Sequence, residues 1–127
     1  MSIMLARPGA AVTGVDYSGN MIRLARERTA SEYGIRFEQG NCEDLSFLPN
    51  RSFDLIVSNM VLHDLHHYDK ANGEMYRLLV DGGLFVFSIL PPCFVTPGSG
   101  WVKSDSGEKL YWKVDRYFYE GVYEQAF

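Results

Sequence analysis

Apolar and polar positions change their spacing several times along this chain, and each change predicts an element. Four apolar or alternating runs predict strands, at residues 10–15, 35–39, 53–58 and 84–90. Three stretches with helical spacing or helix-stop signals predict helices, at residues 2–7, 18–33 and 68–79. Because strand and helix alternate, the order predicts an α/β fold with a mostly parallel sheet and flanking helices.

The pattern changes after Pro92. Residues 96–107 are rich in Gly, Ser and Thr, and aromatic side chains crowd the rest of the chain. The strand-like composition of residues 111–119 predicts a hairpin that turns near Val114 and Asp115. We therefore expect an α/β core over residues 1–95 and an aromatic C-terminal extension over residues 96–127, which serves as a lid or a dimerisation segment.

Composition narrows the class of protein. A chain of 127 residues is expected to form one domain, and its net charge of −4 argues against a general nucleic-acid binder. No apolar run reaches the roughly 20 residues that cross a membrane, and the first residues lack the pattern of a signal peptide. Cys42 and Cys93 lie far apart without CxxC spacing, so the sequence predicts a reduced, cytoplasmic setting and no zinc site.

Asp16 is the first candidate for chemistry. It ends the predicted strand at residues 10–15, and Ser18 follows as the N-cap of the next helix. Nucleotide-binding α/β folds hold a ribose at such a strand-to-helix turn, where a carboxylate accepts hydrogen bonds from the sugar hydroxyls. The alternative is that Asp16 only caps the helix.

Four consecutive segments carry a family resemblance. GVDYSGNMIRLAR, GNCEDLSF, FDLIVSNMVLHDL and RLLVDGGLFVFSILPPCF occur in the order and spacing of class I S-adenosylmethionine-dependent methyltransferases. The sequence most resembles the small-molecule branch often labelled type 11, and the likeness covers residues 1–95. The resemblance implies a Rossmann-like, seven-stranded sheet, with S-adenosylmethionine as cofactor and S-adenosylhomocysteine as product.

The same resemblance implies roles for five residues around the adenosyl group. Asp16 would bind the ribose, and Tyr17 and Met21 would pack near the adenine. The position of Asn41 usually holds an Asp that bonds the exocyclic amine of adenine, and the Asn carbonyl can still accept that bond. The backbone N–H of Cys42 would meet an adenine ring nitrogen.

Further residues are expected near the reacting methyl group. By resemblance, Ser58 and Asn59 would lie under the methionine portion of the cofactor. Alignment of the acceptor contributes most to this chemistry, about 7–11 kcal/mol, and a base helps only if the acceptor loses a proton. His63 follows the third predicted strand and is the candidate base; the alternative is an ordinary loop histidine.

Three histidines raise the question of a metal site. His63, His66 and His67 have i, i+3, i+4 spacing, which on a helix would place them on one face beside Asp64. Such short motifs often match by chance, and no metal is predicted.

One element that the resemblance implies has no counterpart in this sequence, which contains no GxGxG. The first strand and its glycine-rich turn would precede residue 1, and the final antiparallel strands would follow residue 127. In the family that first strand lies between the strands at residues 10–15 and 53–58, so both would keep an unpaired edge. The two strands could pair directly, a segment of another copy could insert, or two copies could exchange tails; we expect a homodimer.

Two functions remain open. The resemblance implies methyl transfer from S-adenosylmethionine to an unidentified small molecule. The alternative is a truncated, non-catalytic methyltransferase-like module that serves in oligomerisation or binding. A dinucleotide-dependent dehydrogenase would use Asp16 equally well, but it leaves the FDLIVSNMVLHDL and DGGLFVFS segments unexplained.

Overall fold

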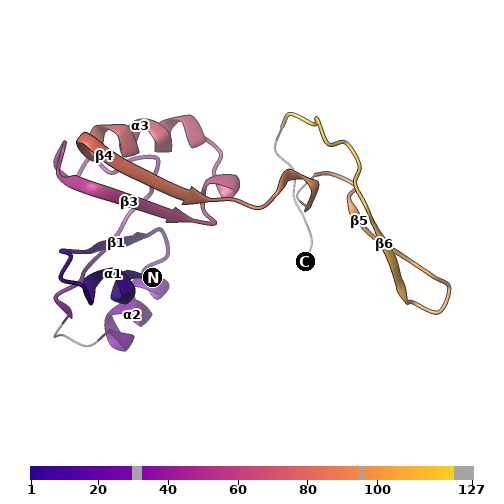
Figure 1. The fold of residues 1–127 in the computed structure, drawn as a ribbon, viewed down its shortest axis with the longest axis horizontal. Coiled ribbons are helices and arrows are strands. Elements are labelled where there is room, and N and C mark those ends of the chain that lie inside the picture. The colour runs from indigo at the N-terminus through magenta and orange to yellow at the C-terminus, as the bar shows by residue number, and fades with distance from the viewer. Residues whose placement is uncertain (30–32, 95, 122–127) are drawn as a thin grey trace. The chain divides into compact units, whose positions relative to one another are not determined.

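The computed structural model describes residues 1–29, 33–94 and 96–121 (Figure 1). These residues form two compact units. The first consists of Met1–Ile56 and His67–Phe85, and the second of Val57–His66 and the chain from Val86 onward. Within the described ranges, no helix has the length and hydropathy needed to cross a membrane.

The first unit contains a short parallel sheet. Strand β1 (Thr13–Asp16) pairs with β2 (Arg36–Gln39), so that Asp16 lies opposite Gln39. Helix α1 (Ser2–Ala6) precedes β1, and helix α2 (Gly19–Arg28) follows it. The predicted helix over residues 18–33 ends early, because Thr29 is extended (φ −102°, ψ 121°); residues 30–32 lie outside the described part.

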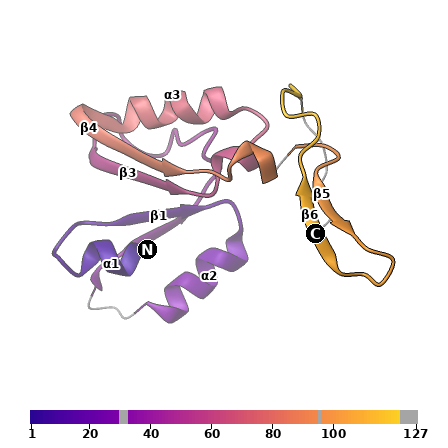
Figure 2. The same cartoon turned by 45° about the vertical axis from the view of Figure 1, so that its right-hand side comes forward.

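A second strand pair follows. Strand β3 (Phe53–Asn59) and strand β4 (Leu79–Ser88) form another two-stranded sheet, and their arrows point the same way in both views (Figure 2). Helix α3 (Tyr68–Leu78) connects them and agrees closely with the predicted helix.

Residues 81–83, Asp-Gly-Gly, have the composition of a turn, but in the structure they lie inside β4. Helix α3 passes directly into β4, so the strand begins earlier than predicted. Leu78 O accepts from Ser52 N at 2.8 Å, and Ser88 O accepts from Met60 N at 3.0 Å, so β4 uses more residues than β3 between these two points. Gly82, with φ +79°, adopts the left-handed conformation that accommodates this irregularity.

One hydrophobic core stabilises the first unit. Leu45, Leu48, Met75 and Leu78 are buried in it. Side chains from both strand pairs pack against this core, including Val15 of β1 and Ile56 of β3.

Despite the shared core, β1 and β3 do not pair. Among the described strands, β1 pairs with β2 and β3 pairs with β4, in separate sheets. The direct pairing of β1 with β3, one of the three arrangements considered from the sequence, is therefore not formed. The described part thus holds two parallel pairs where the resemblance implies a sheet of seven strands.

The second unit contains an antiparallel hairpin. Strand β5 (Gly100–Lys103) pairs with β6 (Lys109–Lys113). The hairpin turns between Ser104 and Glu108, so the turn predicted near Val114 and Asp115 was wrong. Ser104 makes the observed turn favourable, since its backbone N–H donates to Glu108 O at 2.9 Å and its hydroxyl accepts from Glu108 N at 3.1 Å.

Aromatic contacts hold the hairpin to the preceding 3-10 turn η3 (Pro92–Phe94). Trp112 lies 5.5 Å from both Trp101 and Phe94, measured between ring centroids. Its indole N–H donates to Cys93 O at 2.9 Å, and the Lys109 ammonium lies 5.0 Å from the centre of the Trp101 ring. This cluster accounts for part of the aromatic enrichment seen in the C-terminal sequence.

Candidate cofactor site

The turn from β1 into α2 fixes the position of Asp16. Its Oδ1 accepts a hydrogen bond from Ser18 N at 2.8 Å, and Ser18 Oγ accepts one from Met21 N at 3.4 Å. Ser18 is therefore the cap of α2, as predicted, while Asp16 stabilises the turn itself. The Asp16 carboxylate is exposed, and its two oxygens together can accept about four hydrogen bonds, so the bond to Ser18 leaves capacity for a ribose.

A pocket lies beside this turn. Tyr17, Gln39, Gly40 and Asn41 line a volume of about 400 Å³ at the carboxyl ends of β1 and β2. Open parallel α/β sheets bind their ligands outside the carboxyl ends of the strands. The structure thus brings together two predicted residues, Tyr17 and Asn41, although Asp16 itself adjoins the pocket through Tyr17 rather than lining it.

Gln39 is a pocket residue that sequence reasoning missed. Its Nε2 donates to Tyr17 O at 3.1 Å, which ties the end of β2 to the turn after β1. A Cβ atom added at Gly19 would lie 3.0 Å from Gln39 Oε1, so the glycine permits this close approach. The available signal was its place as the last residue of the strand predicted at residues 35–39.

The loop after β2 folds back on itself at Asn41. Asn41 Oδ1 accepts from Glu43 N at 3.0 Å, and Asn41 O accepts from Asp44 N at 2.9 Å. A carbonyl oxygen has two lone pairs, so Asn41 Oδ1 can accept a second hydrogen bond from a ligand amine. Cys42 packs against the core, and burial raises the pKa of its thiol, which keeps it protonated near neutral pH.

Two large side chains are exposed nearby in the sequence, Tyr17 at the pocket and Met21 in the first turn of α2. The side chains of Tyr17 and Met21 are 77% and 54% exposed. Apolar groups left in water at a pocket mouth favour a planar, largely apolar ligand such as a purine. The residues present therefore fit an adenosyl group.

The end of β3 belongs to the second unit. Asn59 Oδ1 accepts from Ser88 Oγ at 2.6 Å, which links the ends of β3 and β4 next to Ser58. Met60 follows with φ +59°, a left-handed conformation that is costly for a residue with a side chain. Ser88 is a second residue that the sequence did not indicate.

His63 lies in a 3-10 turn, η2 (Leu62–Asp64), in the same unit. Its Nε2 is 3.6 Å from Asp64 Oδ1, a charge contact that forms when the imidazole is protonated. Its Nδ1 is buried and has no hydrogen-bond partner among the described residues. Most buried nitrogens are paired, so this one calls for an explanation.

The three histidines do not share a helix face. His63 belongs to η2, whereas His67 is the N-cap residue of α3. Within residues 1–29, 33–94 and 96–121, no three acidic, His or Cys side chains gather closely enough to hold a metal ion. The spacing would place the three histidines on one face only in a continuous helix, and the chain is extended at Leu65 between η2 and α3.

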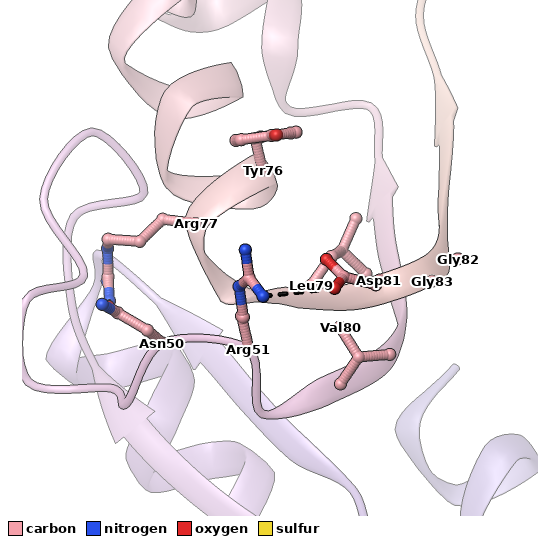
Figure 3. A pocket seen from close by; sticks show the side chains of 9 residues that line it. All are labelled: Asn50, Arg51, Tyr76, Arg77, Leu79, Val80, Asp81, Gly82 and Gly83. Atoms are coloured by element: carbon pink, nitrogen blue, oxygen red, sulfur yellow. Dashed lines mark hydrogen bonds and ion pairs between the residues drawn. The ribbon is translucent and has the colours of Figure 1, made fainter.

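A second pocket of about 430 Å³ lies at the start of β4, where Arg51 Nη1 contacts Asp81 Oδ2 at 3.2 Å (Figure 3). It is found where β3 and β4 begin, not at the carboxyl ends of strands. The location that α/β sheets use for nucleotides is therefore the pocket at Tyr17 and Asn41.

Comparison with known proteins identifies the family to which this chain belongs. Residues 1–87 match the type 11 family model described as a methyltransferase domain. Demethylmenaquinone methyltransferase of Listeria welshimeri is 37% identical over 87 residues, which are 65% of this chain and 36% of that protein. The Staphylococcus aureus protein of the same name is 37% identical over 79 residues, 62% of this chain and 32% of that protein.

Solved structures show the same similarity. A structure described as a putative S-adenosylmethionine-dependent methyltransferase from Listeria monocytogenes aligns with TM-score 0.80 and 33% identity, over 91% of this chain and 55% of that one. An S-adenosylmethionine-dependent methyltransferase from Mesorhizobium loti aligns with TM-score 0.73 and 34% identity, over 87% and 50% of the two chains.

The chain thus spans about a third of the length of these curated relatives and about half of these solved structures. The family match and the α/β fold confirm the resemblance read from the sequence. The chain belongs to the class I methyltransferases of type 11, a family whose cofactor is S-adenosylmethionine.

Proposed function

We propose that this protein transfers a methyl group from S-adenosylmethionine to a small molecule, and that the pocket at Tyr17, Gln39, Gly40 and Asn41 holds the adenosyl part. The observation that carries the proposal is the position of this pocket, at the carboxyl ends of two parallel strands and next to an exposed carboxylate. Membership of the methyltransferase family supports the same assignment.

Each residue of the adenosyl site has a separate task. Asp16 accepts hydrogen bonds from the ribose hydroxyls, since Ser18 N already fixes one of its oxygens in place. The exposed rings and chains of Tyr17 and Met21 cover the adenine. Asn41 Oδ1 accepts from the exocyclic amine, and the backbone N–H of Cys42 donates to a ring nitrogen.

The remaining tasks concern the reacting end. When bound, S-adenosylmethionine supplies a methyl group on a positively charged sulfur. We assign Ser58 and Asn59 to the methionine portion, and the hydrogen bond from Ser88 Oγ to Asn59 Oδ1 supports this by fixing the Asn59 side chain. Holding the acceptor in line accounts for most of the rate gain expected from such a site.

We assign His63 as the base that takes a proton from the acceptor. Two observations support this: its buried Nδ1 lacks a protein partner in the described part, and Asp64 lies beside its other nitrogen. An acceptor hydroxyl or amine at Nδ1 would satisfy that nitrogen. His63→Asn should therefore lower the rate of methyl transfer while leaving affinity for S-adenosylhomocysteine unchanged.

Calorimetric titration with S-adenosylhomocysteine tests the proposal directly. The wild-type protein should bind, and Asp16→Ala should weaken binding by about 1.5–3 kcal/mol, roughly 10- to 150-fold, as expected for hydrogen bonds to a charged group. Asp81→Ala is the matched control, because Asp81 is an exposed carboxylate at the other pocket. Absence of binding at millimolar ligand would overturn the assignment.

Methyl transfer itself requires an acceptor. Radiolabelled S-adenosylmethionine can be offered with a panel of small molecules, and demethylmenaquinone belongs on the panel because the curated relatives carry that name. Transfer of label to a panel compound supports catalysis. Cofactor binding without transfer to any compound favours the non-catalytic module instead.

We also propose that the protein is a homodimer. Within the described strands, β1 and β3 each keep one unpaired edge, and the apolar side chains of Leu55, Leu84 and Val86 are exposed on β3 and β4. Unpaired edges and apolar faces are commonly covered in assemblies. Sedimentation equilibrium of the wild type should give twice the mass of one chain. Leu84→Lys should shift the protein toward the monomer. The control Tyr76→Lys, on the exposed side of α3, should remain a dimer.

The remaining assignments are proposals of the same kind. We propose that residues 1–95 carry the cofactor and that residues 96–127 form a lid or part of the dimer contact. Cys42 and Cys93 are both free thiols, which supports a reduced, cytoplasmic setting. The net charge of −4 supports a small-molecule partner rather than nucleic acid.

A further inference from the structure

Arg77 of α3 lies outside the pocket at Tyr17 and Asn41, but it makes several hydrogen bonds to the loop that forms one wall of that pocket. Its Nη1 donates to Leu48 O at 2.9 Å and to Asn50 Oδ1 at 2.5 Å, and its Nη2 donates to Leu45 O at 2.9 Å. Figure 3 shows its guanidinium next to the Asn50 side chain. Three points of the loop after β2 are therefore bound to one side chain.

Glu74, one turn earlier on α3, completes this arrangement. Its two oxygens accept from Arg77 Nε at 2.9 Å and Arg77 Nη2 at 2.7 Å, a two-point pairing of carboxylate and guanidinium. Glu74 Oε2 also accepts from Leu45 N at 2.7 Å. The backbone N–H of Leu45 is therefore bound by Glu74, and the backbone carbonyl of Leu45 is bound by Arg77.

The contacts continue toward the pocket. Asp44, the neighbour of Leu45, donates its N–H to Asn41 O at 2.9 Å, which closes the turn at the pocket wall. At the other end of α3, His67 N donates to Glu43 Oε1 at 3.2 Å. The segment from Asn41 to Asn50 is consequently fixed to α3 on both sides of Asp44.

We propose that the Glu74–Arg77 pair positions the adenine-binding loop, setting where Asn41 Oδ1 meets the exocyclic amine of the cofactor. The pair acts through Leu45 and Asp44, so both members are positioning residues and neither touches the ligand. This inference rests on the proposed function, since it assumes that Asn41 reads the adenine.

The chemistry explains why these residue types are used. A planar guanidinium can hold two backbone carbonyls and a carboxylate at once, whereas a lysine ammonium cannot reproduce that fork. The two side chains are only 26% and 18% exposed, so water competes weakly for these bonds. A loop fixed before the ligand arrives loses less freedom on binding, which strengthens and sharpens recognition.

The test compares two ligands that differ at the recognised group. S-Adenosylhomocysteine carries the exocyclic amine, and S-inosylhomocysteine carries an oxygen in its place. The wild-type protein should prefer the adenine form by at least about three- to tenfold, the value of the one neutral hydrogen bond to Asn41 Oδ1, because the inosine form lacks the amine and also carries a proton on N1. In Arg77→Met, Arg77→Lys and Glu74→Gln this ratio should fall toward one, while the exposed control Arg51→Met keeps it.

A merely structural role would give a different result. If the pair only stabilised the fold, all variants would bind both ligands with the wild-type ratio, and the proposal would be overturned. Arg77→Lys and Glu74→Gln keep the test decisive should Arg77→Met fail to fold.

Hydrogen exchange without any ligand separates this inference from the proposed function. Exchange of the Asp44 amide should be at least about tenfold faster in Arg77→Lys than in wild type or Arg51→Met, while the Ile22 amide of α2 is unchanged. Unchanged exchange at Asp44 would overturn the inference. Failure of the wild type to bind either ligand, with faster exchange at Asp44, would overturn the proposed function and the adenine contact of Asn41, but not the anchoring of the loop by the Glu74–Arg77 pair.

Discussion

At the scale of single residues, the hydrogen-bond partners that surround a side chain decide what it contributes to stability. Glu74 is one of 16 acidic residues, and nothing in its sequence neighbourhood marks it. In the structure the Arg77 guanidinium holds the pKa of the Glu74 carboxyl below its ordinary value of 4.5, and the Leu45 N–H acts in the same direction. The folded state therefore favours ionised Glu74, and the unfolded chain takes up a proton at higher pH.

This difference in pKa makes the stability of the protein depend on pH. Glu74 makes its full contribution to the free energy of unfolding above about pH 4.5. That contribution is lost as the pH falls through the lower pKa of the folded state. The urea midpoint of wild type should exceed that of Glu74→Gln near neutral pH, and the difference should shrink at acid pH. The exposed Glu27→Gln, from a surface ion pair, is the control and should change little at any pH. A constant difference for Glu74→Gln would contradict the prediction.

At the scale of elements, local pattern located the helices well and the strand boundaries less well. The apolar spacing at residues 68–79 agrees with α3 (Tyr68–Leu78), because helix periodicity is a local property. The start of β4 could not be predicted in the same way. Residues 81–83 have the composition of a turn, yet they lie in a strand that pairs with β3, a partner distant in sequence.

Two glycines on either side of this junction should respond oppositely to alanine. A Cβ at Gly73 in α3 would meet nothing within 4 Å, so Gly73→Ala should stabilise the protein by about 0.5–1 kcal/mol. A Cβ at Gly83 would lie 3.0 Å from Val80 O and 3.2 Å from Asp54 O, both backbone atoms. Gly83→Ala should therefore destabilise it by about 1–3 kcal/mol. Urea denaturation measures both, and changes of equal sign would refute the packing described at Gly83.

At the scale of the whole molecule, burial is uneven. The buried apolar residues of the described chain all belong to the first unit, whereas the buried residue of the second unit is Thr96. The second unit instead relies on its hairpin and on contacts among Phe94, Trp101 and Trp112. Because buried apolar area supplies most of the stability of a fold, the second unit should be the less stable.

Two spectroscopic probes can follow the units separately. Both tryptophans of the chain lie in the hairpin, and helices α1, α2 and α3 all lie in the first unit. Tryptophan fluorescence should therefore change at lower urea than circular dichroism at a helix wavelength. Coincident transitions would indicate a single cooperative unit and contradict this expectation.

The sequence by itself determined the family, the α/β order of elements and the turn that carries Asp16. These follow from local signals: a strand ending in a carboxylate, an N-cap at Ser18, helical spacing, and motifs in a fixed order. The predicted roles of Asp16, Asn41 and His63 remain to be tested by the titrations and variants above.

Tertiary structure alone decided which distant residues meet. Folding brought Gln39 to Tyr17, Ser88 to Asn59, and Arg77 to the loop after β2. It also placed the turn of the hairpin between Ser104 and Glu108. The contacts of Gln39, Ser88 and Arg77 join residues far apart in the sequence, so no local pattern predicts them, and each forms only when the elements that carry the two residues pack together. The turn at Asp16 was thus predicted from local pattern, while packing brought together the residues that line the neighbouring pocket.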